Sequence, residues 1–143
     1  MITVEHTVEI DRPIDEVFAY LTDLERLPEW QASVSEVQVD GPVEPGSRFR
    51  DVREFMGRRA ASTLEVTELE PPRRFSLRVA EGPIRYEIDH RLEERGQRTS
   101  VTFSGRGDTA RVPRLMRGMV ERAVRRQLAS DAESLKQALE RRP

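Results

Sequence analysis

The 143-residue sequence contains no cysteine, which excludes disulfide bonds, thiolate catalysis and zinc sites built on sulfur. Lysine is almost missing too, because Lys136 is the only lysine among 24 basic residues. Aromatic residues make up only 6% of the chain, and Trp30 is the single tryptophan. No apolar run approaches the ~20 residues that a membrane-spanning helix needs. We therefore expect one domain, covering residues 1–143, without a membrane span.

The charges are abundant but nearly balanced. Charged residues make up 35% of the chain and the formal net charge is -2, so charge balance points to neither nucleic acid nor an anionic membrane. The arginines near the C-terminus have Glu121, Asp131 and Glu133 nearby and no interleaved aromatics, which indicates a solvated helix face. The N-terminus lacks the basic and apolar regions of a signal peptide. We expect a cytoplasmic protein and leave its oligomeric state open.

The strongest pattern in the sequence is its ending. Over residues 112–139 the apolar side chains recur at helical spacing, which predicts one long amphipathic helix, roughly 40 Å long. The apolar residues are Val112, Leu115, Met116, Met119, Val120, Ala123, Val124, Leu128, Ala132, Leu135 and Leu139. Such a helix needs a surface to lie on, and a sheet needs a cover for its apolar face.

The N-terminal part begins with strict alternation over residues 2–10, which predicts a half-buried strand. Pro13 then suits the first turn of a short helix, in which apolar residues follow at helical spacing. A second short helix is predicted at residues 24–27, limited by Pro28.

Between residues 33 and 107 the chain reads as short strands separated by turns. Six strands are predicted, at residues 35–39, 48–56, 59–69, 75–79, 84–92 and 101–105. In the third of these the alternation slips before Leu69, which indicates a bulge. Short turns favour an antiparallel meander that the first strand joins. The pattern predicts an α+β fold in which seven strands grip the long helix.

Polar residues on predicted inward faces are the candidates for chemistry. His6 replaces an apolar residue on the buried face of the first strand, and a buried imidazole should be neutral unless it is paired. Tyr86 and His90 share a strand face about 13–14 Å apart, so they could contact two ends of one ligand. The alternatives are a core histidine at His6 and an exposed edge position for His90.

Residues Phe49, Asp51, Arg53 and Phe55 alternate onto one face of their strand. The two phenylalanines predict that this face looks inward, which would make Asp51 and Arg53 a charged pair in a pocket. The alternative is an exposed cross-strand salt bridge of little energetic value.

Three further regions complete the predicted ligand-binding set. Met116 and Met119 could form an adaptable helix wall beside a ligand, or belong to an ordinary core. Trp30 could guard the entrance of a pocket or seal the end of the sheet, and Phe103 lies on the last strand. The two histidines lack metal-ligand spacing, so we expect no metal and no cofactor.

Several local strings resemble the START-like superfamily (also termed SRPBCC), which includes polyketide cyclase/dehydratase-like and Bet v 1-like proteins. These strings are residues 8–18 (VEIDRPIDEVF), 21–23 (LTD), 28–30 (PEW), 46–49 (GSRF) and 68–75 (ELEPPRRF). The resemblance implies a helix-grip fold, with a curved antiparallel sheet around the C-terminal helix and two short helices closing one end. It also implies a cavity for an apolar or amphipathic ligand.

A dry apolar cavity of roughly 300 Å³ would cost about 7 kcal/mol, comparable to the stability of a whole domain. Such a pocket must therefore hold a ligand or water, together with polar side chains. Three functions remain open. The first is binding of an apolar or amphipathic small molecule of polyketide, lipid or ring type. The second is cyclase/dehydratase-like catalysis with His6, Asp51, Tyr86 or His90 as acid or base, and the third is a protein-interaction module of the chaperone-activating type.

Overall fold

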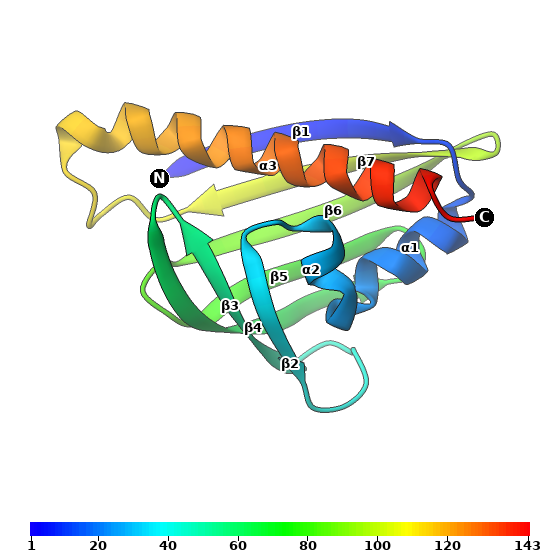
Figure 1. Cartoon of the computed structure of the whole chain (residues 1–143), viewed down its shortest axis with the longest axis horizontal. Helices are drawn as coiled ribbons and strands as arrows, with labels where there is room; N and C mark the ends of the chain where they lie inside the picture. Colours follow the sequence, from blue (N-terminus) through cyan, green and yellow to red (C-terminus); the bar gives the residue numbers. More distant parts are fainter.

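The computed structural model describes residues 1–143, and its seven strands form one antiparallel sheet (Figure 1). The spatial order of the strands is β1-β7-β6-β5-β4-β3-β2, so only the first strand leaves the meander, to pair with the last. The strands are β1 (Ile2–Ile10), β2 (Val34–Val39), β3 (Arg48–Phe55), β4 (Arg58–Glu70), β5 (Arg74–Glu81), β6 (Tyr86–Arg95) and β7 (Arg98–Gly107). The predicted α+β helix-grip fold is confirmed.

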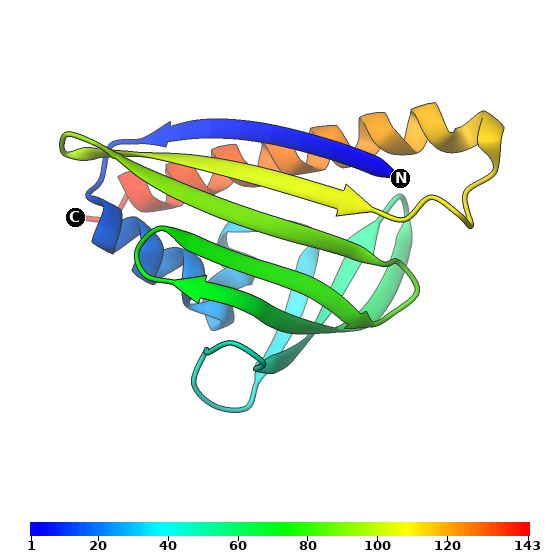
Figure 2. The ribbon, with the colours of Figure 1, turned by 180° about the vertical axis from the view of Figure 1, so that it is seen from behind.

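The long helix α3 (Arg117–Glu140) lies along β1 on the concave side of the sheet (Figure 1). Only its second half is firmly packed, because the first buried side chain is that of Leu128. Toward its start the helix extends past the ends of β1 and β7 (Figure 2). The regular helix begins later than the sequence predicted, since a 3-10 turn, η2 (Arg114–Met116), precedes it.

Two short helical segments follow β1 and close one end of the grip. The first, α1 (Ile14–Thr22), buries its apolar stripe, and Pro13 precedes it in an extended conformation. The second is a 3-10 turn, η1 (Leu24–Arg26), that continues into α2 (Leu27–Trp30). Pro28 was predicted to end this helix, but it stands in the first turn of α2, where its missing N–H costs no hydrogen bond.

The strand register shows where the pairing in the sheet is irregular and where it ends. Two register shifts in the β4–β5 pair, between Thr63 and Leu64 and between Val66 and Glu68, confirm the predicted bulge. Strand β6 begins at Tyr86, two residues later than predicted, because Ile84 lies in the exposed β5–β6 loop. The β5–β6 pairing ends at Arg78 and Glu87, so the two strands separate beyond that point.

The apolar core lies between the sheet and the second half of α3, and it continues under α1 and α2. Its largest fully buried side chains include those of Trp30, Phe75 and Phe103. The core is therefore dense near the helical cap and less filled toward the start of α3. No helix of the chain is long and apolar enough to cross a membrane.

Candidate functional site

Strand β3 turns its charged pair toward the interior. Phe49 and Asp51 are 2% and 1% exposed, and Asp51 pairs across the sheet with Ser62 of β4, which is also buried. The Arg53 guanidinium donates to Asp51 Oδ2 from Nε at 3.0 Å and from a terminal nitrogen at 2.6 Å. The alternative of an exposed salt bridge is therefore wrong. The second oxygen, Asp51 Oδ1, is buried without a hydrogen-bond partner.

Tyr86 of β6 lies beside this ion pair. The guanidinium carbon of Arg53 is 5.7 Å from the centroid of the Tyr86 ring, a cation–π arrangement. The phenolic oxygen is buried and has no hydrogen-bond partner. Burial, opposed by the charge of Arg53, raises the pKa of Tyr86 to about 12, so the hydroxyl keeps its proton at neutral pH.

Asp131 of α3 faces the same group of side chains, and we interpreted it from the sequence as part of a solvated surface. That interpretation is wrong, because Asp131 is 8% exposed and accepts a hydrogen bond from Gln127 Nε2 at 2.9 Å. Burial raises its pKa to about 6, although the Gln127 hydrogen bond and the charge of Arg53 both oppose the shift. The signal was present in the spacing, since Asp131 falls between Leu128 and Leu135 on the apolar stripe.

Burial also acts on Arg53, whose guanidinium has three charged or ionisable neighbours in Asp51, Tyr86 and Asp131. Burial by itself would lower the pKa of Arg53. The three neighbours have the larger combined effect and hold the pKa of Arg53 above its ordinary value. We name Asp51, Arg53, Tyr86 and Asp131 the inner polar group. It brings β3, β6 and α3 together around one permanent positive charge.

His90 occupies a second position on β6, nearer the helical cap. It is 2% exposed, and its ring stacks on Phe75 at 5.6 Å and meets the edge of Phe103 at 4.9 Å. The edge-exposed alternative is therefore wrong. His90 Nδ1 lies 2.9 Å from the carbonyl oxygen of Phe75, whereas Nε2 is buried without a partner. Burial lowers the pKa of His90 to about 4, so the imidazole is neutral at pH 7.

Because a carbonyl only accepts hydrogen bonds, the Phe75 contact assigns the proton of neutral His90 to Nδ1. Nε2 then carries a free lone pair inside the grip. Trp30, packed edge-on against Phe103 at 6.2 Å, contributes a buried Nε1–H donor that also has no partner. Trp30 lies under the cap with 2% exposure, which fits the sealing position that the sequence left open.

The remaining candidates lie away from these groups or are only partly covered. His6 is opposite Phe103 in the β1–β7 register, but it is half-buried instead of enclosed. Phe55 is half-buried near the end of β3. Met116 and Met119 are 42% and 44% exposed at the start of α3, so they do not belong to the core. Ligand contact by any of these residues stays a prediction.

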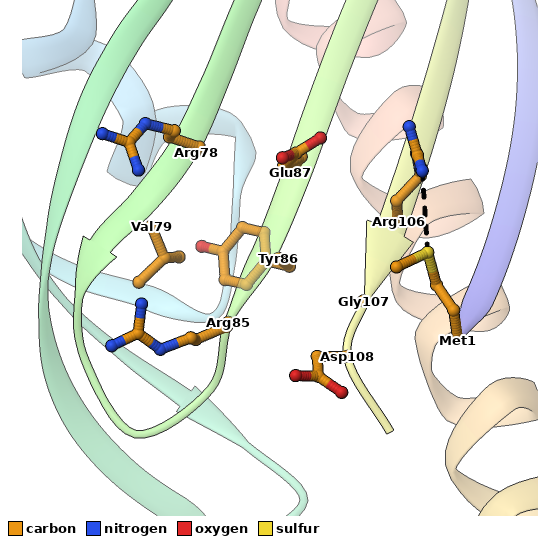
Figure 3. A pocket seen from close by; sticks show the side chains of 9 residues that line it. All are labelled: Met1, Arg78, Val79, Arg85, Tyr86, Glu87, Arg106, Gly107 and Asp108. Atoms are coloured by element: carbon orange, nitrogen blue, oxygen red, sulfur yellow. Dashed lines mark hydrogen bonds between the residues drawn. The ribbon is translucent and has the colours of Figure 1, made fainter. Parts of the chain in front are cut away.

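Several pockets indent the molecule, and two of them lie beside the connections between strands of the grip. The larger, about 200 Å³, lies where β5 and β6 separate, and Figure 3 shows the Tyr86 side chain directed toward Val79 across it. The smaller, about 150 Å³, lies under the loop between β2 and β3. The larger pocket is lined by Met1, Arg78, Val79, Arg85, Tyr86, Glu87, Arg106, Gly107 and Asp108. Tyr86 therefore connects the inner polar group to this opening.

No group of three or more His, Asp or Glu side chains is placed to hold a metal ion. The polar side chains on the inner face can form hydrogen bonds and exchange protons. They supply a fixed cation at Arg53, a neutral base at His90 and a carboxyl group of raised pKa at Asp131.

Solved structures share this fold over nearly the whole chain. A protein from Thermus thermophilus matches with a TM-score of 0.85 and 22% identity, covering 96% of this chain and 97% of that one. The Zhui aromatase/cyclase from Streptomyces sp. R1128 matches with a TM-score of 0.85 and 22% identity, covering 98% and 94%. A START superfamily protein from Mycobacterium smegmatis matches with a TM-score of 0.84 and 17% identity, covering 98% of each chain.

No curated protein sequence matches the chain. The model of one protein family, described as polyketide cyclase / dehydrase and lipid transport, matches residues 1–140. The START-like resemblance inferred from the sequence strings is thereby confirmed. This chain belongs to the polyketide cyclase/dehydrase and lipid transport family.

Proposed function

We propose that the protein binds an amphipathic small molecule between the inner face of the sheet and α3. The observation that carries this proposal is a set of buried polar atoms without protein partners, Asp51 Oδ1, Tyr86 OH and His90 Nε2. A buried polar atom without a hydrogen bond costs about 1–3 kcal/mol, and native proteins hold few of them. All three belong to strands of the sheet and are enclosed by the grip, which fits a site where a ligand supplies the missing partners.

The inner face of β7 also leaves space for a ligand. Gly105 and Gly107 stand opposite Ile88 and Tyr86 in the β6–β7 register, on the row of inward-facing residues. A Cβ atom added at Gly107 would meet nothing within 4 Å. At Gly105 a Cβ atom would already lie 3.4 Å from a methyl carbon of Val4, so the free space lies at Gly107, beside Tyr86.

The unpartnered atoms define the chemistry of the ligand. Asp51 Oδ1 and His90 Nε2 are acceptors, whereas Tyr86 OH can donate or accept. His90 is packed against the rings of Phe75, on which it stacks, and of Phe103, which it meets edge-on. The ligand is therefore a ring-bearing apolar molecule with hydroxyl groups that donate hydrogen bonds, a description that suits polyketide-derived phenols better than simple fatty acids.

A cyclase- or dehydratase-like reaction is the second candidate, and the raised pKa of Asp131 favours it. A carboxyl group with a pKa of about 6 exchanges protons near neutral pH, as an acid or base in aldol condensation and dehydration must. Asp131 is better suited than His90, whose pKa of about 4 makes it a weak base. The fold shared with an aromatase/cyclase supports this candidate without assigning the reaction.

Binding is tested with 2-naphthol, a small ring with one hydroxyl, followed by its fluorescence. We expect saturable binding that Tyr86→Phe or His90→Phe weakens about 2- to 10-fold, the value of one hydrogen bond. Gly107→Leu should abolish binding by filling the space beside Tyr86. Gly118→Ala is the matched glycine control, because Gly118 is exposed on α3, and it should bind like the original chain.

Unchanged affinity in all three variants would refute the proposed site. Native mass spectrometry of the purified protein gives an independent result, because a retained molecule of defined mass would identify the ligand class. For the catalytic candidate, a reactive poly-β-ketone is supplied to the original chain and to Asp131→Asn. Loss of product with retained naphthol binding would support Asp131 as acid or base, and turnover by Asp131→Asn would reject it.

A further inference from the structure

The end of the molecule that holds the start of α3 carries most of its exposed large apolar side chains. Leu115 is 99% exposed, and Met116 and Met119 are 42% and 44% exposed. Met56 in the β3–β4 turn and Ile84 in the β5–β6 loop are each 51% exposed. Figures 1 and 2 place the β3–β4 turn, the β5–β6 loop and the start of α3 at the same end, opposite the C-terminus.

Arginines accompany each of these apolar side chains. We define the mouth face as residues 56–59, 82–85 and 109–119, three segments that contain no acidic residue. Its arginines are all exposed, and they are Arg58, Arg59, Arg85, Arg111, Arg114 and Arg117. The rest of the chain then carries all 26 acidic residues against 18 basic ones, because 24 minus these 6 leaves 18. These three segments thus carry six positive charges in a chain whose net charge is -2.

Few of the six arginines of the mouth face interact with other residues of the protein. None of the six is paired with a carboxylate, and the contacts of Arg59 and Arg117 are a 3.4 Å hydrogen bond to Ser35 and a 3.3 Å hydrogen bond to the Val112 carbonyl oxygen. Acidic residues flank the segments at Glu54, Glu81, Glu87, Asp108 and Glu121. Glu54 lies opposite Arg59 in the β3–β4 register without forming an ion pair with it, and Glu121 already pairs with Arg125. The arginines of the mouth face are therefore free to meet an external negative charge.

We propose that the mouth face docks on an anionic lipid bilayer. Apolar side chains interleaved with arginines on one face are the pattern of an interfacial membrane contact, in which the apolar groups enter the headgroup layer and the guanidinium groups meet lipid phosphates. Charge complementarity selects a bilayer with anionic lipids. Leu115 is almost completely exposed, so its burial requires a partner into which the side chain can insert. A bilayer provides this, whereas a polar protein surface would leave Leu115 in contact with water.

The mouth face lies beside an opening to the interior, so docking on a bilayer would bring that opening close to the lipids. The face borders the pocket formed where β5 and β6 separate, because Arg85 lines that pocket and belongs to the face (Figure 3). An apolar molecule could then pass between the bilayer and the interior without crossing water. This role in ligand exchange rests on the proposed function, whereas docking itself does not.

Docking is tested by sedimentation of the full chain with vesicles of mixed phosphatidylglycerol and phosphatidylcholine, and with vesicles of phosphatidylcholine alone. We expect binding to the anionic vesicles only, weakened by salt. Leu115→Ser should reduce the partition coefficient about tenfold, the value of one inserted leucine. Replacing one arginine in each segment, as Arg58→Gln, Arg85→Gln and Arg114→Gln together, should reduce it on the order of a hundredfold, at about fivefold per charge.

Arg141→Gln is the charge-matched control, because Arg141 is exposed at the opposite end of α3. It should bind vesicles like the original chain. Failure of the original chain to bind anionic vesicles overturns the proposal, as does an equal loss in Arg141→Gln or an unaffected Leu115→Ser variant. If the chain is instead a dimer that Leu115→Ser dissociates, the proposal is overturned and the face is an interface between two copies. Naphthol binding measured without vesicles shows separately whether the interior site functions.

Discussion

His90 Nδ1 lies 2.9 Å from the carbonyl oxygen of Phe75, and this contact leaves His90 Nε2 as an unprotonated acceptor inside the grip. Turning the ring by 180° about the Cβ–Cγ bond would break that hydrogen bond. The acceptor is thus held in place before any ligand arrives. A preorganised acceptor favours binding because little side-chain freedom remains to be lost.

Acidification should destabilise the protein through His90. Its folded pKa of about 4 lies below the ordinary value of 6.5, so protons bind the unfolded chain more tightly. The stability is fully present above pH 6.5 and is lost as the pH falls toward 4, by about 3 kcal/mol at about 1.4 kcal/mol per pH unit. Urea unfolding of the original chain and of His90→Phe should show a difference in stability that changes across this window. A His90 ring that titrates near pH 6.5 by NMR would contradict the prediction.

Asp131 should act in the opposite direction. Its folded pKa of about 6 lies above the ordinary value of 3.8, so its contribution is favourable below pH 3.8 and is lost as the pH rises through 6. Asp131→Asn keeps an oxygen to accept the Gln127 hydrogen bond and removes the buried charge. We expect it to stabilise the protein by up to about 3 kcal/mol at about pH 8, with no gain at about pH 4. Glu133→Gln, an exposed neighbour, should change nothing in the same denaturation series.

Removal of one partner of the Asp51–Arg53 pair should be far more harmful than removal of both. Arg53→Leu leaves the carboxylate of Asp51 buried without its only hydrogen-bond donors, and the expected loss of stability is about 3–5 kcal/mol. The double variant with Asp51→Leu and Arg53→Leu should recover most of this loss. The exposed Arg95–Glu93 pair serves as control, because its removal should cost less than about 1 kcal/mol. Equal costs for the two pairs in thermal unfolding would show that Asp51 is hydrated.

Tyr20 and Tyr86 both pack on the core, but only one of the two hydroxyl groups has a hydrogen-bond partner in the protein. Tyr20 donates a hydrogen bond to Glu29 Oε1 at 3.0 Å, whereas the hydroxyl of Tyr86 has no partner. Tyr20→Phe should therefore cost about 1 kcal/mol of unfolding free energy, and Tyr86→Phe should cost nothing or stabilise slightly. Chemical denaturation of the two variants in the absence of ligand makes the comparison. A loss in Tyr86→Phe equal to that in Tyr20→Phe would show that the Tyr86 hydroxyl already has a structural partner.

Periodicity predicted the fold well because the sheet and the long helix both bury one face, and burial leaves a regular trace in the sequence. The inward direction of β3 followed from the alternation of Phe49, which is buried, with Phe55, which is half-buried. Asp131 was misread because a charged residue on a helix is usually solvated, although its place on the apolar stripe showed otherwise. The separation of β5 from β6 was out of reach, since pairing between strands depends on contacts that no local pattern encodes.

The grouping of arginines at one end was equally hidden from the sequence. Residues 56–59, 82–85 and 109–119 are far apart along the chain, and only the folding of three connections to the same end unites them. A net charge is a sum over the whole chain, so it does not show that positive charges are concentrated in one region of the surface. This is why the overall balance of -2 gave no sign of an anionic partner.

The pairing of β1 with β7 decides when the protein can fold. Thr7 and Thr102 share a hydrogen bond at 3.0 Å although 95 positions separate them, and the backbone N–H of Asp11 bonds Glu140 near the far terminus. Strand β1 must therefore wait, unpaired, until β7 has been synthesised. Such remote partners slow the search for the native topology, and they make any truncated nascent chain a ready substrate for chaperones and for aggregation.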